Sequence, residues 1–260
     1  MDRVHLACIG LGGRGTGLAN LVASMDDVHV AAVCDVYPDR VERAIDRIDE
    51  AQSYRPEGYA NYDDVLRRED LDGVIVATSW TTHVEISLAA MRAGLYVGSE
   101  VGGAASIQEC WELVRTSEET GMPFMLLENC CYGREEMAVL NMVKKDLFGE
   151  LIHCQCGYEH DLRSEISRGE ENRHYRLNNF VHRNGDLYPT HGLGPIDEEE
   201  DASLVAHGAD LADRDNRADL IVSPDHRDHD RVFTDGLCDL FGGHEASGVR
   251  LKIGDLTALL

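Results

Sequence analysis

A glycine pattern near the start of the chain limits what this sequence can fold into. An apolar run over residues 4–9 is followed by Gly10, Gly12 and Gly15, which have the spacing G-x-G-x-x-G. In a nucleotide-binding turn, the first glycine permits the tight turn, the second lets a pyrophosphate touch the backbone, and the third lets a helix pack closely on a strand. Helical spacing of the next apolar residues predicts a helix whose N-terminal N–H groups face the phosphates. Glycine-rich turns are common, so this triplet alone is a weak signal.

A second signal lies at the end of the next apolar run. Residues 28–34 lead directly into Asp35, 20 residues after Gly15. An acid at this place accepts hydrogen bonds from the ribose hydroxyls of an adenosine and repels a 2′-phosphate. The two signals together predict NAD as cofactor, in preference to NADP. Arg40 is near enough in sequence to weaken that preference, but we expect it to be a solvated helix residue after Pro38.

Strand and helix patterns alternate through residue 128, which is typical of an α/β fold with a doubly wound parallel sheet. The expected elements are helices over residues 38–53, 84–93 and from Ser106 onward, and strands over residues 71–78, 95–99 and 123–128. Gly94 is expected to end the second helix, and Ser106 with Glu109 has the spacing of a capping box.

The pattern changes at Asn129. A helix over residues 132–146 and a strand over 151–158 are expected before a polar, irregular stretch. A connection as rich in Arg, Asn, His and Tyr as residues 184–195 indicates a site-forming loop. We therefore predict an NAD-binding domain over residues 1–128, the start of a substrate-binding α/β domain over 129–195, and an acidic, loosely ordered tail over 196–260.

Composition excludes several classes of partner. A net charge of −24 and an isoelectric point near 4.7 argue against nucleic acid and anionic membranes. Apolar runs stay shorter than the roughly 18 residues of a membrane span, and the first strand leaves no room for a signal peptide, so a cytoplasmic protein is expected. The eight cysteines have no C-x-x-C spacing and are expected to be free thiols, with no bound metal. The His/Asp cluster at residues 225–230 is expected to be a solvated charge run.

Two later motifs are more specific. The segments ENCCYGREE at residues 128–136 and NGDLYPTHGLGP at 184–195 closely resemble the NAD-dependent α-N-acetylgalactosaminidases of glycoside hydrolase family 109. That family lies within the glucose–fructose oxidoreductase-like and inositol dehydrogenase-like (Gfo/Idh/MocA) superfamily. The resemblance covers residues 3–195 and implies a Rossmann domain followed by an α/β domain whose open sheet holds the sugar, here incomplete.

The resemblance also implies which residues bind. Contacts to NAD are implied at Gly10, Gly12, Gly13, Arg14, Gly15, Asp35, Trp80, Thr81, Thr82, His83, Glu100, Val101 and Asn129. Contacts to the sugar are implied at Tyr158, Arg176, Tyr188, Pro189, Thr190 and His191. Ordinary packing for Trp80 and Tyr158, a helix start for His83 and a surface charge for Arg176 are the alternatives.

Two departures from the family pattern bear on function. Glu100-Val101-Gly102 stands where dehydrogenases of the superfamily carry Glu-Lys-Pro, which favours the hydrolase branch. The hydrolases also supply a substrate-binding tyrosine from their C-terminal half, whereas no tyrosine follows Tyr188. A truncated or divergent C-terminal part is the expectation.

The implied reaction cleaves α-N-acetylgalactosaminides through oxidation at C3, elimination, water addition and re-reduction, with no net redox change. His191 is expected to be the general acid/base, with Tyr188 and Tyr158 assisting at the sugar hydroxyls and Arg176 holding the sugar. The expected partner is a small molecule or glycan with terminal N-acetylgalactosamine, and a homo-oligomer is allowed. Two alternatives stay open: a sugar or inositol dehydrogenase, and an NAD-binding fragment without catalysis.

Overall fold

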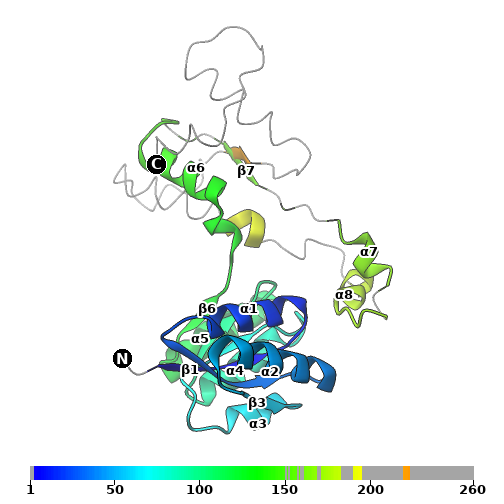
Figure 1. Cartoon of the computed structure of the whole chain (residues 1–260). Coiled ribbons are helices and arrows are strands. Elements are labelled where there is room, and N and C mark those ends of the chain that lie inside the picture. The colour runs from blue at the N-terminus through cyan, green and yellow to red at the C-terminus, as the bar shows by residue number, and fades with distance from the viewer. Residues whose placement is uncertain are drawn as a thin grey trace. The chain divides into compact units, whose positions relative to one another are not determined.

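The computed structural model describes residues 3–149, 151, 153–156, 158, 161–168, 171–182, 190–194 and 219–222. The chain divides into two compact units (Figure 1). Unit 1 comprises Met1–Leu127 and Arg173–Arg183, and unit 2 comprises Glu128–Asn172 and Asn184–Leu260.

Unit 1 contains a six-stranded sheet in the order β3-β2-β1-β4-β5-β6, with every neighbouring pair parallel. Its strands are β1 (Val4–Ile9), β2 (Val28–Cys34), β3 (Glu57–Tyr59), β4 (Gly73–Val76), β5 (Tyr96–Ser99) and β6 (Phe124–Leu126). This order is that of the dinucleotide-binding fold, in which ligands bind beyond the carboxyl ends of the strands where the order reverses. The reversal lies between β1 and β4.

Helices cover both faces of this sheet, as the alternation of β1 side chains requires. The helices are α1 (Gly13–Ala23), α2 (Pro38–Gln52), α3 (Tyr62–Leu66), α4 (His83–Arg92) and α5 (Ile107–Thr120), with α8 (Arg176–His182) in the later segment. Ala7 and Ile9 belong to a core that includes residues of α3, α4 and α5, whereas Cys8 belongs to a second core with residues of α1 and α2. The doubly wound α/β fold is therefore confirmed.

Local details differ from the predictions in places. Strand β3 was not predicted, because its three residues carry no apolar run. The strand expected over residues 123–128 ends at Leu126. The Ser106 hydroxyl accepts the Glu109 N–H at 3.2 Å as expected, but the Glu109 carboxylate accepts the N–H of Ala105 at 2.6 Å, one residue before the cap.

Unit 2 begins with a 3₁₀ turn, η1 (Cys130–Tyr132), and helix α6 (Arg134–Lys144), so the helix predicted from residue 132 starts two residues later. Strand β7 (His153–Cys156) pairs in parallel with β8 (Asp219–Val222). Short helix α7 (Arg163–Ile166) falls in the stretch predicted to be irregular, and residues 190–194 are helical. Apart from β8, the predicted acidic tail and its His/Asp cluster lie outside the described residues.

Five cysteines, Cys8, Cys34, Cys110, Cys130 and Cys131, are free thiols, as predicted. Cys8, Cys34 and Cys131 are buried, whereas Cys110 is exposed. Burial raises the pKa of the Cys8 and Cys34 thiols to about 12. Among the described residues, none of the helices is long and apolar enough to cross a membrane.

Candidate active site

The glycine turn after β1 has the geometry of a phosphate cradle. Gly10 has φ 93°, in the left-handed region, and a Cβ there would lie 2.6 Å from the Ala77 carbonyl carbon. A Cβ on Gly15 would lie 1.8 Å from the Gly10 oxygen, so the helix approaches the strand too closely for a side chain. By contrast, a Cβ on Gly12 would meet nothing nearer than 3.9 Å, and one on Gly13 nothing within 4 Å. The first and third glycines are needed for packing, and the space above the turn stays open.

Helix α1 begins at this turn without a capping side chain. Gly12 is its N-cap, and no acidic residue stands in the first turn. The first N–H groups of the helix therefore point to the open side with the positive end of the helix dipole behind them, an arrangement that suits a pyrophosphate. The residues present fit a bound dinucleotide.

Asp35 lies at the carboxyl end of β2, where the ribose of such a ligand would be. The buried carboxylate accepts the Leu11 N–H through Oδ2 at 2.7 Å and the Tyr37 N–H through Oδ1 at 2.9 Å. These two bonds fix its orientation beside the glycine turn. An ionised carboxylate has about four acceptor positions, so capacity remains for ribose hydroxyls.

Arg40 differs from its prediction as a solvated residue. Its side chain is only 18% exposed, and Nη1 lies 3.7 Å from Asp35 Oδ2. The guanidinium also covers the Tyr37 ring, 4.6 Å from its centroid. The cause is the first turn of α2, which brings Arg40 back over the end of β2.

Two loops beyond β4 and β5 complete this edge of the sheet. Trp80 is 3% exposed, and a Cβ on Gly102 would lie 2.3 Å from its ring, so the loop after β5 packs directly on the indole. The Arg14 Nε–H donates to Glu100 Oε1 at 2.7 Å, and the Val101 N–H donates to Oε2 of the same carboxylate at 3.2 Å. Four of the predicted cofactor residues are thereby held together at the carboxyl ends of the strands.

The loop after β4 is held by its own hydroxyl groups. The Thr82 hydroxyl donates to Thr78 Oγ1 at 2.8 Å and to the Ser79 carbonyl at 2.9 Å, while Thr81 is exposed beside Ser79. His83, predicted to contact the cofactor, is 2% exposed, and its Nε2 lies 3.2 Å from the Thr78 carbonyl. The imidazole is enclosed by protein, and its Nε2 holds this loop through the Thr78 carbonyl, while its contact with a cofactor stays a prediction.

Burial of His83 predicts a pH dependence of stability. Burial lowers the pKa of its imidazole below the ordinary 6.5, so between the two values the unfolded chain binds the proton and the folded chain does not. The stabilisation is complete above pH 6.5 and is lost as the pH falls below it. Urea unfolding from pH 7.5 down to 5 should show a shallower loss in His83→Gln than in the wild type. His182→Gln, which removes an exposed histidine, should keep the wild-type slope; equal slopes in all three proteins would refute this role for His83.

A segment from late in the chain, Arg173–Arg183, belongs to the first unit. Arg173 binds both carboxylate oxygens of Asp39, at 2.8 and 2.7 Å, and lowers the pKa of that carboxyl to about 2. Tyr175 packs edge-on against Trp80, with ring centroids 5.1 Å apart. The segment thus joins the ends of β2 and β4, the strands on either side of β1 and its glycine turn.

Arg176, a predicted sugar contact, belongs to the same segment. Its guanidinium carbon lies 5.4 Å from the centroid of Trp80 and 5.2 Å from that of Tyr175, and Nη1 lies 3.2 Å from His174 Nε2. Stacking on two aromatic rings orients the planar fork of N–H donors. A predicted cofactor residue and a predicted sugar residue are brought together here.

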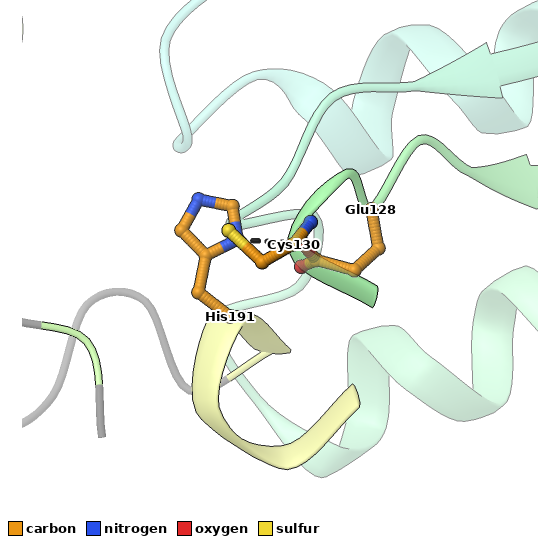
Figure 2. Close-up of side chains that lie close together, drawn as sticks. All are labelled: Glu128, Cys130 and His191. Carbon is orange, nitrogen blue, oxygen red and sulfur yellow. Dashed lines mark hydrogen bonds and ion pairs between the residues drawn. The ribbon is translucent and has the colours of Figure 1, made fainter. Parts of the chain in front are cut away.

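Unit 2 contains a carboxylate–imidazole pair in which the imidazole is buried and the carboxylate is partly buried. Glu128 Oε1 lies 2.6 Å from His191 Nδ1, and the same oxygen accepts the N–H groups of Asn129 and Cys130, each at 2.8 Å (Figure 2). Burial opposes ionisation of Glu128, but the Cys130 N–H and the nearby Thr190 and His191 side chains outweigh it and lower the pKa of the carboxyl. An ionised carboxylate only accepts, so Nδ1 donates, and Nε2 is left as the ring nitrogen that exchanges a proton.

Cys130 lies beside this pair, and potential ligand atoms of Glu128, Cys130 and His191 fall within 4.8 Å of one another. Two ligands of one tetrahedral zinc ion, each bound at about 2.0–2.1 Å, would be about 3.3 Å apart. The 2.6 Å separation of Oε1 and Nδ1 is that of a hydrogen bond. Burial and the Glu128 charge also raise the pKa of Cys130 to about 12, which keeps the thiol protonated. The geometry favours a hydrogen-bonded pair over a metal centre.

Other predicted sugar residues lie near or beyond this pair. The Tyr158 ring stands edge-on to the His191 imidazole, with centroids 4.6 Å apart, and is 37% exposed. Thr190 precedes His191 on the same short helix. Asn129, which was predicted to contact the cofactor, is exposed next to Glu128. Tyr188 and Pro189 lie outside the described residues.

Two family models match the chain one after the other. A model of an oxidoreductase family with an NAD-binding Rossmann fold matches residues 4–127, and a model of the glycosyl hydrolase 109 C-terminal domain matches residues 132–213. The chain belongs to glycosyl hydrolase family 109. A family 109 protein of Stenotrophomonas maltophilia is 41% identical over 216 residues, 74% of this chain and 48% of the relative. One of Solibacter usitatus is 42% identical over 226 residues, 85% of this chain and 49% of the relative. This family 109 chain spans about half the length of the curated relatives it matches.

Solved structures share the fold of the family 109 chain. The scyllo-inositol dehydrogenase of Lactobacillus casei, solved with NAD(H) and scyllo-inositol, has a TM-score of 0.59 at 16% identity and covers 76% of this chain and 56% of its own. The WlbA dehydrogenase of Bordetella pertussis, solved with NADH and UDP-GlcNAcA, has a TM-score of 0.52 at 16% identity and covers 61% and 48%. The first unit is an NAD-binding Rossmann domain, as predicted.

Glu128 and Arg173 are the members of the candidate site that sequence reasoning missed. Glu128 stands two residues after β6, and an acid just beyond a parallel strand is a signal that would have singled it out. Arg173 contacts a residue 134 positions away, and nothing in its local sequence indicates that partner.

Proposed function

We propose that this family 109 chain is an NAD-dependent glycosidase that cleaves α-N-acetylgalactosaminides without net redox change. The observation that carries the proposal is the Glu128–His191 pair, because it provides a buried, oriented proton carrier in a chain whose first unit is an NAD-binding domain. When bound, NAD⁺ supplies a hydride acceptor at the sugar that later returns the hydride. The remaining chemistry is proton transfer, which falls to the side chains.

In this proposal, the glycine turn and Asp35 hold the dinucleotide. Open space above Gly12 and Gly13 and the uncapped start of α1 suit the pyrophosphate, and the fixed Asp35 carboxylate suits the adenosine ribose. The Arg14–Glu100 pair and Trp80 form the edge of the sheet beyond β4 and β5. These groups bind and orient, and they take no part in proton transfer.

His191 is the proposed general acid/base. Ionised Glu128 takes the Nδ1 proton in a hydrogen bond and stabilises the imidazolium that forms when Nε2 gains a proton. Removal of the C2 proton of an oxidised sugar and protonation of the departing C1 oxygen are steps that such a group performs. Tyr158, with its ring against the imidazole, is proposed to contact the sugar hydroxyls, as are Tyr188, Pro189 and Thr190.

Arg176 is proposed to hold the sugar through the N–H groups of its stacked guanidinium.

The competing function is a sugar dehydrogenase, and the dehydrogenases among the solved structures of the same fold favour it. Opposing it, buried Val101 occupies the position after Glu100 where superfamily dehydrogenases carry a lysine ammonium.

One incubation separates the two functions. The chain is mixed with a chromogenic α-N-acetylgalactosaminide and NAD⁺, and leaving-group release and reduced nicotinamide are followed together. The glycosidase releases the leaving group while reduced nicotinamide stays below one equivalent of enzyme. A dehydrogenase accumulates reduced nicotinamide with each turnover, and that result would reject the proposed function.

A further inference from the structure

The adenosine end of the dinucleotide site contains an arrangement of charges that the proposed function does not use. Asp35 and Asp39 supply two carboxylates there, and Arg40 and Arg173 supply two guanidinium groups. Arg40 Nη1 lies 3.7 Å from Asp35 Oδ2, and Arg173 is doubly bonded to Asp39. Formal charge at this corner is therefore balanced, whereas an isolated ribose-binding acid would leave it negative.

Arg40 is held in place from several sides. Its guanidinium carbon lies 4.6 Å from the centroid of the Tyr37 ring, and the guanidinium carbon of Arg173 lies 4.4 Å from the same centroid. Its Nη2 also donates to the Arg173 carbonyl at 3.4 Å. A long side chain normally loses rotamer freedom when it binds a ligand. Because Arg40 is already fixed in the folded protein, binding a ligand costs less conformational entropy.

The guanidinium points toward the ligand side of the site. Arg40 Nη1 is the nearest atom to a Cβ placed on Gly12, at 3.9 Å, so it lies close to both the glycine turn and Asp35. In Rossmann domains an acid at this place binds the ribose of NAD, and an arginine nearby accommodates the 2′-phosphate of NADP; this chain has both. Arginine also recognises phosphate through paired charge-assisted hydrogen bonds.

We propose that Arg40 forms a 2′-phosphate site at the end of β2, so that this chain binds NADP⁺ as well as NAD⁺. The proposal rests on the dinucleotide site of the proposed function but not on its chemistry. Asp35 would bind the ribose of NAD⁺ as before. With NADP⁺, the Arg40 guanidinium pairs with the 2′-phosphate in addition to the Asp35 carboxylate that it faces at 3.7 Å, and Arg173 keeps Asp39 neutralised nearby.

Calorimetric titration with NAD⁺ and with NADP⁺ tests this without any assay of activity. In the wild type, the two dissociation constants should agree within about thirtyfold, whereas an unpaired acid would discriminate more strongly. Arg40→Ala should weaken the binding of NADP⁺ by at least about tenfold, which is the contribution of one charge-assisted hydrogen bond. It should weaken the binding of NAD⁺ by less than about threefold. Arg40→Lys, which keeps the charge, should show an intermediate loss for NADP⁺.

Arg47→Ala is the matched control, because it removes the same charge from an exposed position on the same helix. It should leave both affinities unchanged. The proposal is overturned if wild-type NADP⁺ binding is more than about thirtyfold weaker than NAD⁺ binding, or if Arg40→Ala weakens both ligands equally. If NADP⁺ binding fails in this way while NAD⁺ binding is retained, this inference has failed but the cofactor site of the proposed function stands.

Discussion

Replacing His191 with alanine is expected to lower kcat for glycoside cleavage by about 10²–10⁴, the usual contribution of a general acid/base. The expectation follows from the pair in unit 2, where Glu128 fixes Nδ1 at 2.6 Å and leaves Nε2 to carry the proton. NAD⁺ affinity, measured by calorimetry, should stay within about threefold of the wild type, because the residues proposed to hold the pyrophosphate and the adenosine ribose belong to the other unit.

The matched control is His182→Ala, which removes an exposed histidine from α8 and should leave kcat unchanged. Glu128→Gln keeps the shape of the partner but removes its charge, and should lower kcat by about tenfold or more, since a charged hydrogen bond contributes roughly 1.5–3 kcal/mol. If His191→Ala retains full turnover, the imidazole is a structural group and another side chain transfers the proton.

Gly15→Ala is expected to abolish measurable NAD⁺ binding and to destabilise unit 1. The added methyl carbon would lie 1.8 Å from the Gly10 oxygen and 3.2 Å from the Ala77 Cβ, so α1 has to move away from the strand. Overpacking of this kind costs about 1–3 kcal/mol or more, and displacement of the helix start also removes the N–H groups from the pyrophosphate. Thermal unfolding and calorimetric titration measure the two effects separately.

Gly17→Ala, on the same helix, provides the opposite expectation. A Cβ on Gly17 meets nothing within 4 Å, and the position is helical and exposed. Alanine there should stabilise the chain by about 0.5–1 kcal/mol and leave NAD⁺ affinity intact. Equal behaviour of the two variants would contradict the close helix–strand contact at the third glycine.

Features with a local signature were predictable from sequence. The continuous apolar run of β4, the amphipathic spacing of α2 and the glycine spacing after β1 each arise from neighbouring residues, and the structure confirms all three. Strand β3 was missed because its three residues, Glu57–Tyr59, have no apolar pattern that indicates a strand. Only its backbone pairing with β2 reveals it.

Contacts between distant residues were not predictable. The Glu128–His191 pair spans 63 positions, and the Asp39–Arg173 pair spans 134. Both pairs form only when the chain folds. The prediction of a solvated Arg40 is wrong for the same reason, because nothing in the local sequence shows that the start of α2 turns its side chain toward Asp35. The burial of His83 was not predictable from its motif either, and its contact with a cofactor stays a prediction.

Cleavage in deuterium oxide tests the central claim most directly. If the sugar is oxidised at C3 and eliminated across C1 and C2, the C2 proton is lost to the protein and replaced from solvent. Mass spectrometry and proton NMR of the released N-acetylgalactosamine should then show one deuterium at C2. Product that keeps its original hydrogen at C2 would show direct displacement at C1, and the NAD-dependent account of this chain would be wrong.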